Sequence, residues 1–333
     1  MFWLRSIPRR GACRAICAVL LLPMFASPAR GDEHAAYPHR PIRLVAAQEP
    51  GSATDKIARV VAEALSEHLG GPVVVENRPG AGGSIGAEAV SRAAPDGYTL
   101  LLAGYSNLVV TPALRPDVRY DPLRDFAPIG RVAHVPFVFA VRADAPARSL
   151  AELVAAAKAA PGKLTYGSLG GGVTGMCMAR FLEVTGVDML AVEYKGASSA
   201  ITDLVAGRID FLCNEIGALS AQAQAGRIRL LALPGPRRLA IAAGVPTVVE
   251  AGLPEVRVAP WYGVVAPADT PATLVARLAA ALDVSVKSET FRRRVETMGY
   301  EVIDDTPSAY ARTLREEVEG VRRTLSRTRS AAK

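Results

Sequence analysis

The sequence predicts an α/β protein in which two lobes are joined by two long crossover strands. Short apolar segments alternate with alanine-rich segments of helical periodicity, and this is the pattern of βαβ units around a parallel sheet. A long extended segment breaks the alternation twice, at residues 126–142 and 258–266. The chain that follows the N-terminal region, about 300 residues, is longer than a single hydrophobic core usually serves, so two domains are expected.

The first 31 residues have the features of a secretory signal peptide. An arginine-rich stretch without acids precedes an apolar run at residues 16–25, and small residues follow up to Gly31. An apolar run of about ten residues is too short to span a bilayer. We therefore expect cleavage near Gly31 and export to the periplasm, by the general secretory or the twin-arginine route.

The net charge of the mature chain is small. Removing residues 1–31 removes five arginines and no acids, so 34 basic and 32 acidic residues remain and the net charge falls from +7 to +2. Such a balance gives no reason to expect a nucleic-acid partner. The basic cluster around Arg322 and Arg323 is interpreted as a solvated helix end. The four histidines show no metal-ligand spacing, so no metal is expected. No cofactor is expected either. The protein is predicted to be a monomer.

The individual elements follow from local pattern. The strand-like segments are apolar and are bounded by turn residues: 42–47, 73–76, 98–103, 164–166, 189–192, 209–213 and 229–233. The helix-like segments have apolar residues at helical spacing: 54–69, 84–93, 150–159, 174–184, 197–206, 216–225, 271–287 and 307–323. The two crossovers assign residues 32–130 and 262–333 to lobe 1 and residues 131–261 to lobe 2.

Two strand-to-helix joints have the composition of anion-binding sites, because a helix N-terminus presents free N–H groups and the positive end of the helix dipole. The first joint runs from Gln48 to Asp55, where Gly51 allows close approach of a ligand. An ordinary N-cap formed by Thr54 or Asp55 is the alternative. The second joint runs from residue 166 to residue 175 and is rich in glycine, which packing alone explains poorly.

Two enzyme motifs compete with this interpretation. Gly170, Gly172 and Gly175 have the spacing of a dinucleotide-binding fingerprint, which would make the chain a nicotinamide-dependent oxidoreductase. An exported protein, however, works where nicotinamide cofactors are scarce. Ser84 lies in a Gly-x-Ser-x-Gly pattern, but residues 78–80 separate it from the preceding strand, unlike the serine of a nucleophile elbow. We therefore expect no catalytic residue and no enzyme activity.

Two cysteines, Cys177 and Cys213, remain after removal of the signal peptide. An oxidising compartment allows them to pair. Two buried free thiols are the interpretation that we favour.

Several sequence blocks resemble the tripartite tricarboxylate transporter substrate-binding family, also called Bug or TctC-like proteins. Residues 73–83, VVVENRPGAGG, carry the resemblance most clearly. It continues in order at residues 94–101, 120–122, 125–128, 161–168, 194–196, 245–254 and 266–271, and so covers nearly the whole mature chain.

The resemblance implies a type II periplasmic-binding-protein fold, whose two lobes close on a small carboxylate. It implies membrane transporter subunits as partners, with a sensor kinase as the alternative. It also implies contacts from the two joints, from the segment after the third strand and from one later strand end. The expected ligand-binding residues are Gln48, Glu49, Gly51, Ser52, Thr54, Asp55, Tyr105, Ser106, Ser168, Gly172, Val173, Thr174, Gly175, Met176 and Asn214.

Three positions depart from the family pattern. Gln48 replaces a phenylalanine that commonly walls the pocket, Glu49 replaces a proline, and Met176 replaces a frequent histidine. An added acid repels a second ligand carboxylate, by about 1 kcal/mol at 4 Å in water and several-fold more in a desolvated cleft. We therefore expect a ligand with one carboxylate and a cationic or hydrogen-bonding group, such as an amino acid or an amide. A Glu49 side chain turned to solvent is the alternative.

Overall fold

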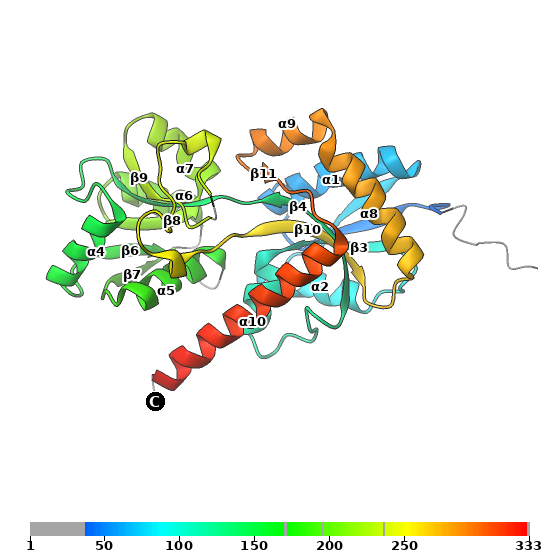
Figure 1. Cartoon of the computed structure of the whole chain (residues 1–333), viewed down its shortest axis with the longest axis horizontal. Helices are drawn as coiled ribbons and strands as arrows, with labels where there is room; N and C mark the ends of the chain where they lie inside the picture. The colour runs from blue at the N-terminus through cyan, green and yellow to red at the C-terminus, as the bar shows by residue number, and fades with distance from the viewer. Residues whose placement is uncertain (1–36, 170–171, 195, 236, 332–333) are drawn as a thin grey trace, which may run out of the picture.

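The protein has two β-sheets, each covered by helices, with two extended segments running between them (Figure 1). The structure is a computed structural model, and it describes residues 37–169, 172–194, 196–235 and 237–331. The predicted signal peptide lies outside the described residues. We call the first sheet with its helices lobe 1 and the second sheet with its helices lobe 2. The predicted α/β architecture with two crossover segments is confirmed.

The sheet of lobe 1 has the strand order β11-β4-β10-β3-β1-β2. Strand β1 lies parallel to β2 and β3, and β10 is antiparallel to both β3 and β4. The bounds of these strands are β1 Ile42–Ala46, β2 Val73–Asn77, β3 Thr99–Gly104, β4 Phe126–His134, β10 Trp261–Pro267 and β11 Glu301–Val302. Strand β3 is buried along its whole length, so both of its faces are covered by helices.

The sheet of lobe 2 has the strand order β7-β6-β8-β5-β9. Strand β6 is parallel to β7 and β8, whereas β5 is antiparallel to β8 and β9. The bounds are β5 Phe137–Arg142, β6 Thr165–Ser168, β7 Leu190–Glu193, β8 Phe211–Glu215 and β9 Ile228–Ala232.

The helices cover the faces of both sheets. In lobe 1 they are α1 Ala53–Leu69, α2 Ser84–Ser91, α3 Thr111–Leu114, α8 Ala272–Lys287, α9 Glu289–Thr297 and α10 Pro307–Ala331. In lobe 2 they are α4 Leu150–Ala159, α5 Val173–Thr185, α6 Ala197–Val205 and α7 Ile216–Gln224. Short helical turns, η1 Ala81–Gly83, η2 Ser106–Val110, η3 Ala240–Ala242 and η4 Pro254–Val256, complete the described elements. Figure 1 shows α10 beginning at lobe 1 and projecting beyond the body of the molecule.

The long apolar segment at residues 126–142 is two strands rather than one. Strand β4 belongs to lobe 1 and β5 to lobe 2, and Val135 and Pro136 separate them. Pro136 has no N–H group to donate to a strand ladder. The N–H group of Val135 donates to the carbonyl of Pro260, so the two crossover segments are hydrogen-bonded to each other where they pass between the lobes. We call Val135, Pro136 and Pro260 the hinge.

The sequence prediction lacks the short helix α3, helix α9, the short strand β11 and the helical turns η1, η2, η3 and η4. Helix α9 and the short strand β11 lie between two predicted helices, and η2 is a π-helical turn directly after β3. The α9 sequence is polar except for two buried residues, Phe291 and Val295, so its apolar face is too narrow to stand out by periodicity.

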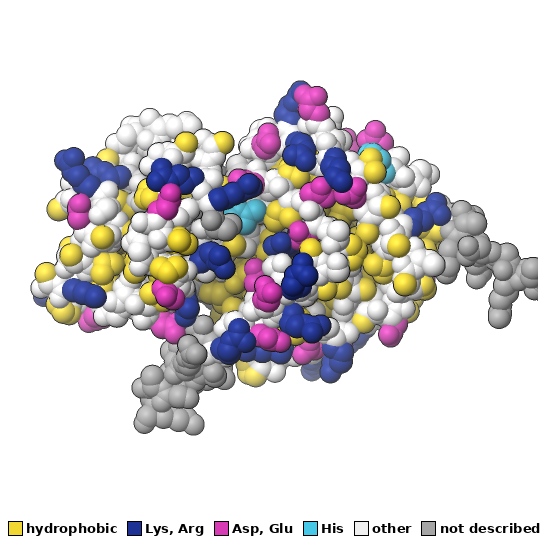
Figure 2. All heavy atoms as spheres, viewed as in Figure 1, with side chains coloured by type: hydrophobic (Ala, Val, Ile, Leu, Met, Phe, Trp, Pro, Cys, Tyr) yellow, Lys and Arg dark blue, Asp and Glu magenta, His cyan; other side chains and the backbone are white. Residues whose placement is uncertain are grey.

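Basic and acidic side chains are interspersed over the face in Figure 2. Many of them form ion pairs across elements, such as Arg294 with Glu63 and Arg322 with Asp121. In the described chain, no helix is both long enough and apolar enough to cross a membrane.

Candidate functional site

A cavity of about 170 Å³ lies between the two lobes, where strands β1, β3, β6 and β8 end. Ligands of open α/β sheets bind outside the carboxyl ends of parallel strands, so this is the expected place for a site. Both lobes and the hinge contribute to its wall. The lining residues are Gln48, Thr54, Gly104, Tyr105, Ser106, Asn107, Val135, Phe137, Leu169, Gly172, Val173, Thr174, Asn214, Glu215, Pro260, Trp261 and Tyr262.

The structure brings about half of the expected ligand-binding residues to this wall. Those on the wall are Gln48, Thr54, Tyr105, Ser106, Gly172, Val173, Thr174 and Asn214. Those off the wall are Glu49, Gly51, Ser52, Asp55, Ser168, Gly175 and Met176. Glu49 is exposed, in agreement with the alternative that its side chain points to solvent.

The first joint is capped from within the chain. The buried carboxylate of Asp55 accepts hydrogen bonds from the N–H of Gly51 at 2.9 Å, from Asn77 Nδ2 at 3.0 Å and from Arg59 Nε at 3.0 Å. The Arg59 guanidinium, with these hydrogen bonds, lowers the pKa of Asp55 to about 2. Ser52 Oγ accepts from the N–H of Asp55 and is the N-cap of α1. An internal carboxylate thus occupies the place where we expected a ligand anion, so ligand contact by Gly51, Ser52 and Asp55 stays a prediction.

The second joint opens onto the cavity. Helix α5 begins at Val173, and its N-cap, Gly172, has no side chain to cap the free N–H groups. A Cβ atom added to Gly172 would meet no atom within 4 Å, so packing does not require glycine there. Val173 and Thr174 line the cavity beside it. The helix N-terminus is therefore available to a bound anion.

Apart from Leu169, which also lines the cavity, the other residues of the second joint are off the wall or outside the described chain. Ser168 is largely buried at the end of β6. Met176 Sδ accepts a hydrogen bond from the Tyr105 hydroxyl at 3.7 Å, which joins α5 to lobe 1 beside the cavity. Gly170 and Gly171 lie outside the described residues.

Tyr105 and Ser106 reach the wall because β3 runs directly into the π-helical turn η2. The turn is fixed by Asn107, whose Oδ1 accepts from the N–H of Gly104 at 2.8 Å. Isolated π-helical turns occur frequently at functional sites, because the wider turn displaces side chains from the regular helix positions.

The structure adds Glu215 to the site, which the sequence analysis missed. Glu215 ends β8, directly after Asn214, and its side chain is partly buried on the cavity wall. Desolvation raises the pKa of its carboxyl group, while a hydrogen bond from the Tyr300 hydroxyl at 3.3 Å acts in the opposite direction. Tyr262 Oη lies 3.1 Å from Thr54 Oγ1, and burial raises the pKa of this tyrosine too. In the sequence, the sign of a functional role for Glu215 was an acidic residue within the largely apolar stretch 211–216.

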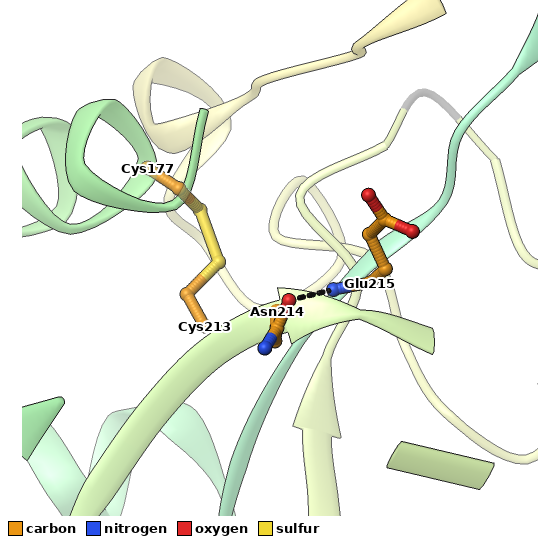
Figure 3. Close-up of a disulfide and its surroundings, with 4 residues drawn as sticks. All are labelled: Cys177, Cys213, Asn214 and Glu215. Carbon is orange, nitrogen blue, oxygen red and sulfur yellow. Dashed lines mark hydrogen bonds between the residues drawn. A yellow bond between two sulfur atoms is a disulfide. The ribbon is translucent and has the colours of Figure 1, made fainter. Parts of the chain in front are cut away.

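Asn214 contributes a buried hydrogen-bond donor to the wall. Its Oδ1 accepts from the N–H of Glu215 at 2.8 Å, and its Nδ2 points away from that bond (Figure 3). Nδ2 is buried and has no hydrogen-bond partner among the described residues. A buried polar group without a partner is costly, so this donor at the cavity wall is available to an acceptor in the cavity.

A second hollow of about 390 Å³ adjoins the cavity and shares Gln48, Ser106, Leu169 and Gly172 with it. It includes Arg115, which pairs with Asp117. In the described part of the cavity wall itself there is no lysine or arginine.

Cys177 and Cys213 form a disulfide, so the expectation of two free thiols is wrong (Figure 3). Both side chains are fully buried, and packing of α5 against β8 places their Cα atoms 6.7 Å apart, within the span that a disulfide bridges. The sequence could not show this proximity, because the residues are 36 positions apart.

The structure shows how Ser84, in the enzyme motif that we rejected, is held in place. Ser84 is buried, and its hydroxyl donates to the carbonyl of Ala81 at 3.0 Å within its own turn. Among the described residues there is also no group of three histidine, cysteine or acidic side chains that could hold a metal ion.

Known proteins resemble the chain over most of its length. Residues 57–328 match the family model described as tripartite tricarboxylate transporter family receptor. A Pseudomonas sp. (strain P51) protein, described as the UPF0065 protein in the tcbD-tcbE intergenic region, is 36% identical over 308 residues, 92% of this chain and 91% of the relative. The structure of periplasmic binding protein BugD has a TM-score of 0.72 at 32% identity, covering 87% of this chain and 98% of BugD. The structure of R. palustris Rpa4515 with adipate has a TM-score of 0.74 at 32% identity, covering 86% and 98% of the two chains.

Proposed function

The chain belongs to the tripartite tricarboxylate transporter family of receptors, and from this premise we propose that it captures a small carboxylate between its lobes and delivers it to membrane transporter subunits. The family is one of solute-binding receptors, so the protein acts by stoichiometric binding without turnover. It works in the periplasm as a monomer, after removal of residues 1–31.

The observation that carries this proposal is the set of hydrogen-bond donors on the cavity wall in lobe 2. The uncapped N-terminus of α5 and the unpartnered Nδ2 of Asn214 both lie there. A carboxylate can accept hydrogen bonds from a helix N-terminus and from an amide donor at once. The adipate bound to the R. palustris relative supports the same class of ligand.

Binding closes the lobes because the cavity wall belongs to both of them. Thr54 and Tyr105 come from lobe 1, whereas Thr174 and Asn214 come from lobe 2. A ligand that contacts both sides stabilises the closed state only, and the change of angle is confined to the hinge. Membrane subunits recognise the closed form. The alternative is that the protein presents its closed form to a sensor kinase. Genes for two membrane subunits next to the gene of this protein would argue against that alternative.

Native mass spectrometry of freshly purified protein, followed by calorimetric titration with the ligand found, tests the proposal. The variant Asn214→Asp keeps the acceptor for the Glu215 N–H and replaces the donor by a charge that repels a carboxylate. We expect a loss of affinity of about 100-fold or more, because a hydrogen bond to a charged group contributes about 1.5–3 kcal/mol and repulsion adds to this.

Ser84→Ala is the matched control, because its hydroxyl bonds only within its own turn. The control should bind like the wild type. If no carboxylate binds the wild type, or if Asn214→Asp binds as tightly as the wild type, the proposal fails.

A further inference from the structure

Hydrogen-bond donors and an acid both line the cavity, and the side chains of Asn214 and Glu215 point in different directions (Figure 3). Asn214 Nδ2 and the N-terminus of α5 supply the donors, and we call this part of the wall the donor end. Glu215 is the acid, and it is the one aspartate or glutamate among the lining residues. A receptor for a simple carboxylate gains nothing from a second carboxylate on its own wall, because like charges repel.

In the described parts of the chain, no lysine or arginine lines the cavity or shifts the pKa of Glu215. The described side chains that interact with Glu215 are two tyrosines. Tyr300, from the segment before β11, donates a hydrogen bond, and Tyr262, from β10, lies beside Tyr300 with ring centroids 6.0 Å apart. Both are neutral hydroxyls whose pKa values are raised by burial. The nearby basic side chain Arg237 forms an ion pair with Glu301 instead.

A partly buried carboxylate with no counter-charge is unfavourable unless a partner arrives with the ligand. The geometry points to Glu215 as the residue that binds a cationic nitrogen of the ligand, so that the receptor selects zwitterions, which carry one carboxylate and one ammonium group. This rests on the proposed function, because the donor end must hold the ligand carboxylate. A cavity of about 150 Å³ holds benzene, so the present cavity suits a short amino acid.

Glu215 is also suited to this role by its place in the fold. It is the last residue of β8 and directly precedes α7, so its backbone is held by the strand ladder with Phe137. Tyr300 belongs to lobe 1 and Glu215 to lobe 2, so the acid lies where lobe closure brings a ligand nitrogen against it.

Calorimetric titration with matched pairs of ligands tests the inference. The probes are 4-aminobutanoate, butanoate and succinate, which share a four-carbon skeleton, together with the common α-amino acids and their desamino counterparts. We expect the best amino acid to bind the wild type about 30-fold more tightly than its desamino counterpart, a difference of about 2 kcal/mol. Succinate should bind more weakly than 4-aminobutanoate.

The variant Glu215→Gln should bring this preference to within about threefold and leave affinity for the desamino acid unchanged or higher. Glu193→Gln, an exposed acid at the end of β7, is the matched control and should keep the wild-type preference. Tyr300→Phe should keep it as well, which separates binding of the ligand by Glu215 from a purely structural bond to Tyr300. Circular dichroism and thermal unfolding confirm that each variant is folded.

Titration against pH provides a second readout. The preference for the amino acid should increase as pH rises through the raised pKa of Glu215, since only the ionised carboxylate attracts an ammonium group. Glu215→Gln should show no such increase. If desamino acids bind as tightly as amino acids, or if Glu215→Gln keeps the preference, the inference is overturned while the proposed function stands. If no carboxylate binds at all, both fail.

Discussion

Removing the disulfide between Cys177 and Cys213 should destabilise lobe 2 strongly. The bond closes a loop of 36 residues between α5 and β8. The chain-entropy relation for a loop of this length gives about 3.8 kcal/mol at 25 °C, from about 12.8 cal/mol/K of entropy removed from the unfolded chain. If lobe 2 unfolds as a unit, this corresponds to a fall in Tm of roughly 8–15 °C, at about 2–4 °C per kcal/mol.

The assay compares urea unfolding of the wild type, with and without a thiol reductant, with that of the double variant Cys177→Ala, Cys213→Ala. Circular dichroism follows the global transition, and hydrogen exchange of peptides from α5 and β8 localises it. Reductant should destabilise the wild type and leave the variant unchanged. The variant serves as the control for unspecific effects of the reductant.

The same bond joins two elements that line the cavity, because Thr174 lies in α5 and Asn214 follows Cys213 in β8. Affinity for the ligand should therefore fall together with stability. Two free thiols in the denatured, unreduced wild type would refute the pairing. Confirmed reduction with a stability loss below about 1 kcal/mol would refute the loop argument.

The other predictions concern single buried groups. Burial raises the pKa of Glu317 to about 7 although Trp261 Nε1 donates a hydrogen bond to it at 2.6 Å. The contribution of Glu317 to the free energy of unfolding should therefore be largest below about pH 4.5 and fall by about 3 kcal/mol as pH rises to about 7. Glu317→Gln should flatten this part of the profile in urea titrations. Asp55→Asn should lower the free energy of unfolding by about 2 kcal/mol at pH 7. It should also remove the loss of stability that the wild type shows as pH falls from about 4 to 2, and acid titrations in which the variant keeps this loss would contradict the capping role of Asp55. Gly263→Ala places a Cβ 2.9 Å from Tyr310 Cζ, so thermal unfolding should show a stability lower by about 1–3 kcal/mol. An unchanged Tm would show that α10, which carries Tyr310, shifts to make room without loss of stability.

Much of the fold is a consequence of local pattern. The alternation of apolar strands and alanine-rich helices is periodic enough to place most elements within a few residues of where the structure has them, and the two interruptions at residues 126–142 and 258–266 identify the crossovers. Helix α9 shows the limit of such reasoning, because its contact with lobe 1 depends on only two buried residues.

The candidate site, too, could be predicted from the sequence only in part. The glycine-rich joint predicts the free N-terminus of α5, because glycine has no side chain that could cap the helix. The first joint contains the same kinds of residues, yet Asp55 fills it from within, and this depends on Asn77 at the end of a neighbouring strand.

The sequence by itself therefore determined the order and type of most elements, the crossover segments and the glycine-rich joint that opens onto the cavity. Only the tertiary structure decided that Cys177 and Cys213 meet, that Asn214 keeps a donor without a partner and that Glu215 faces the cavity. The physical reason is the distance along the chain over which the interactions act, because periodicity and capping involve residues within about four positions of one another. A shared wall, by contrast, depends on how two sheets pack side chains that lie far apart in sequence.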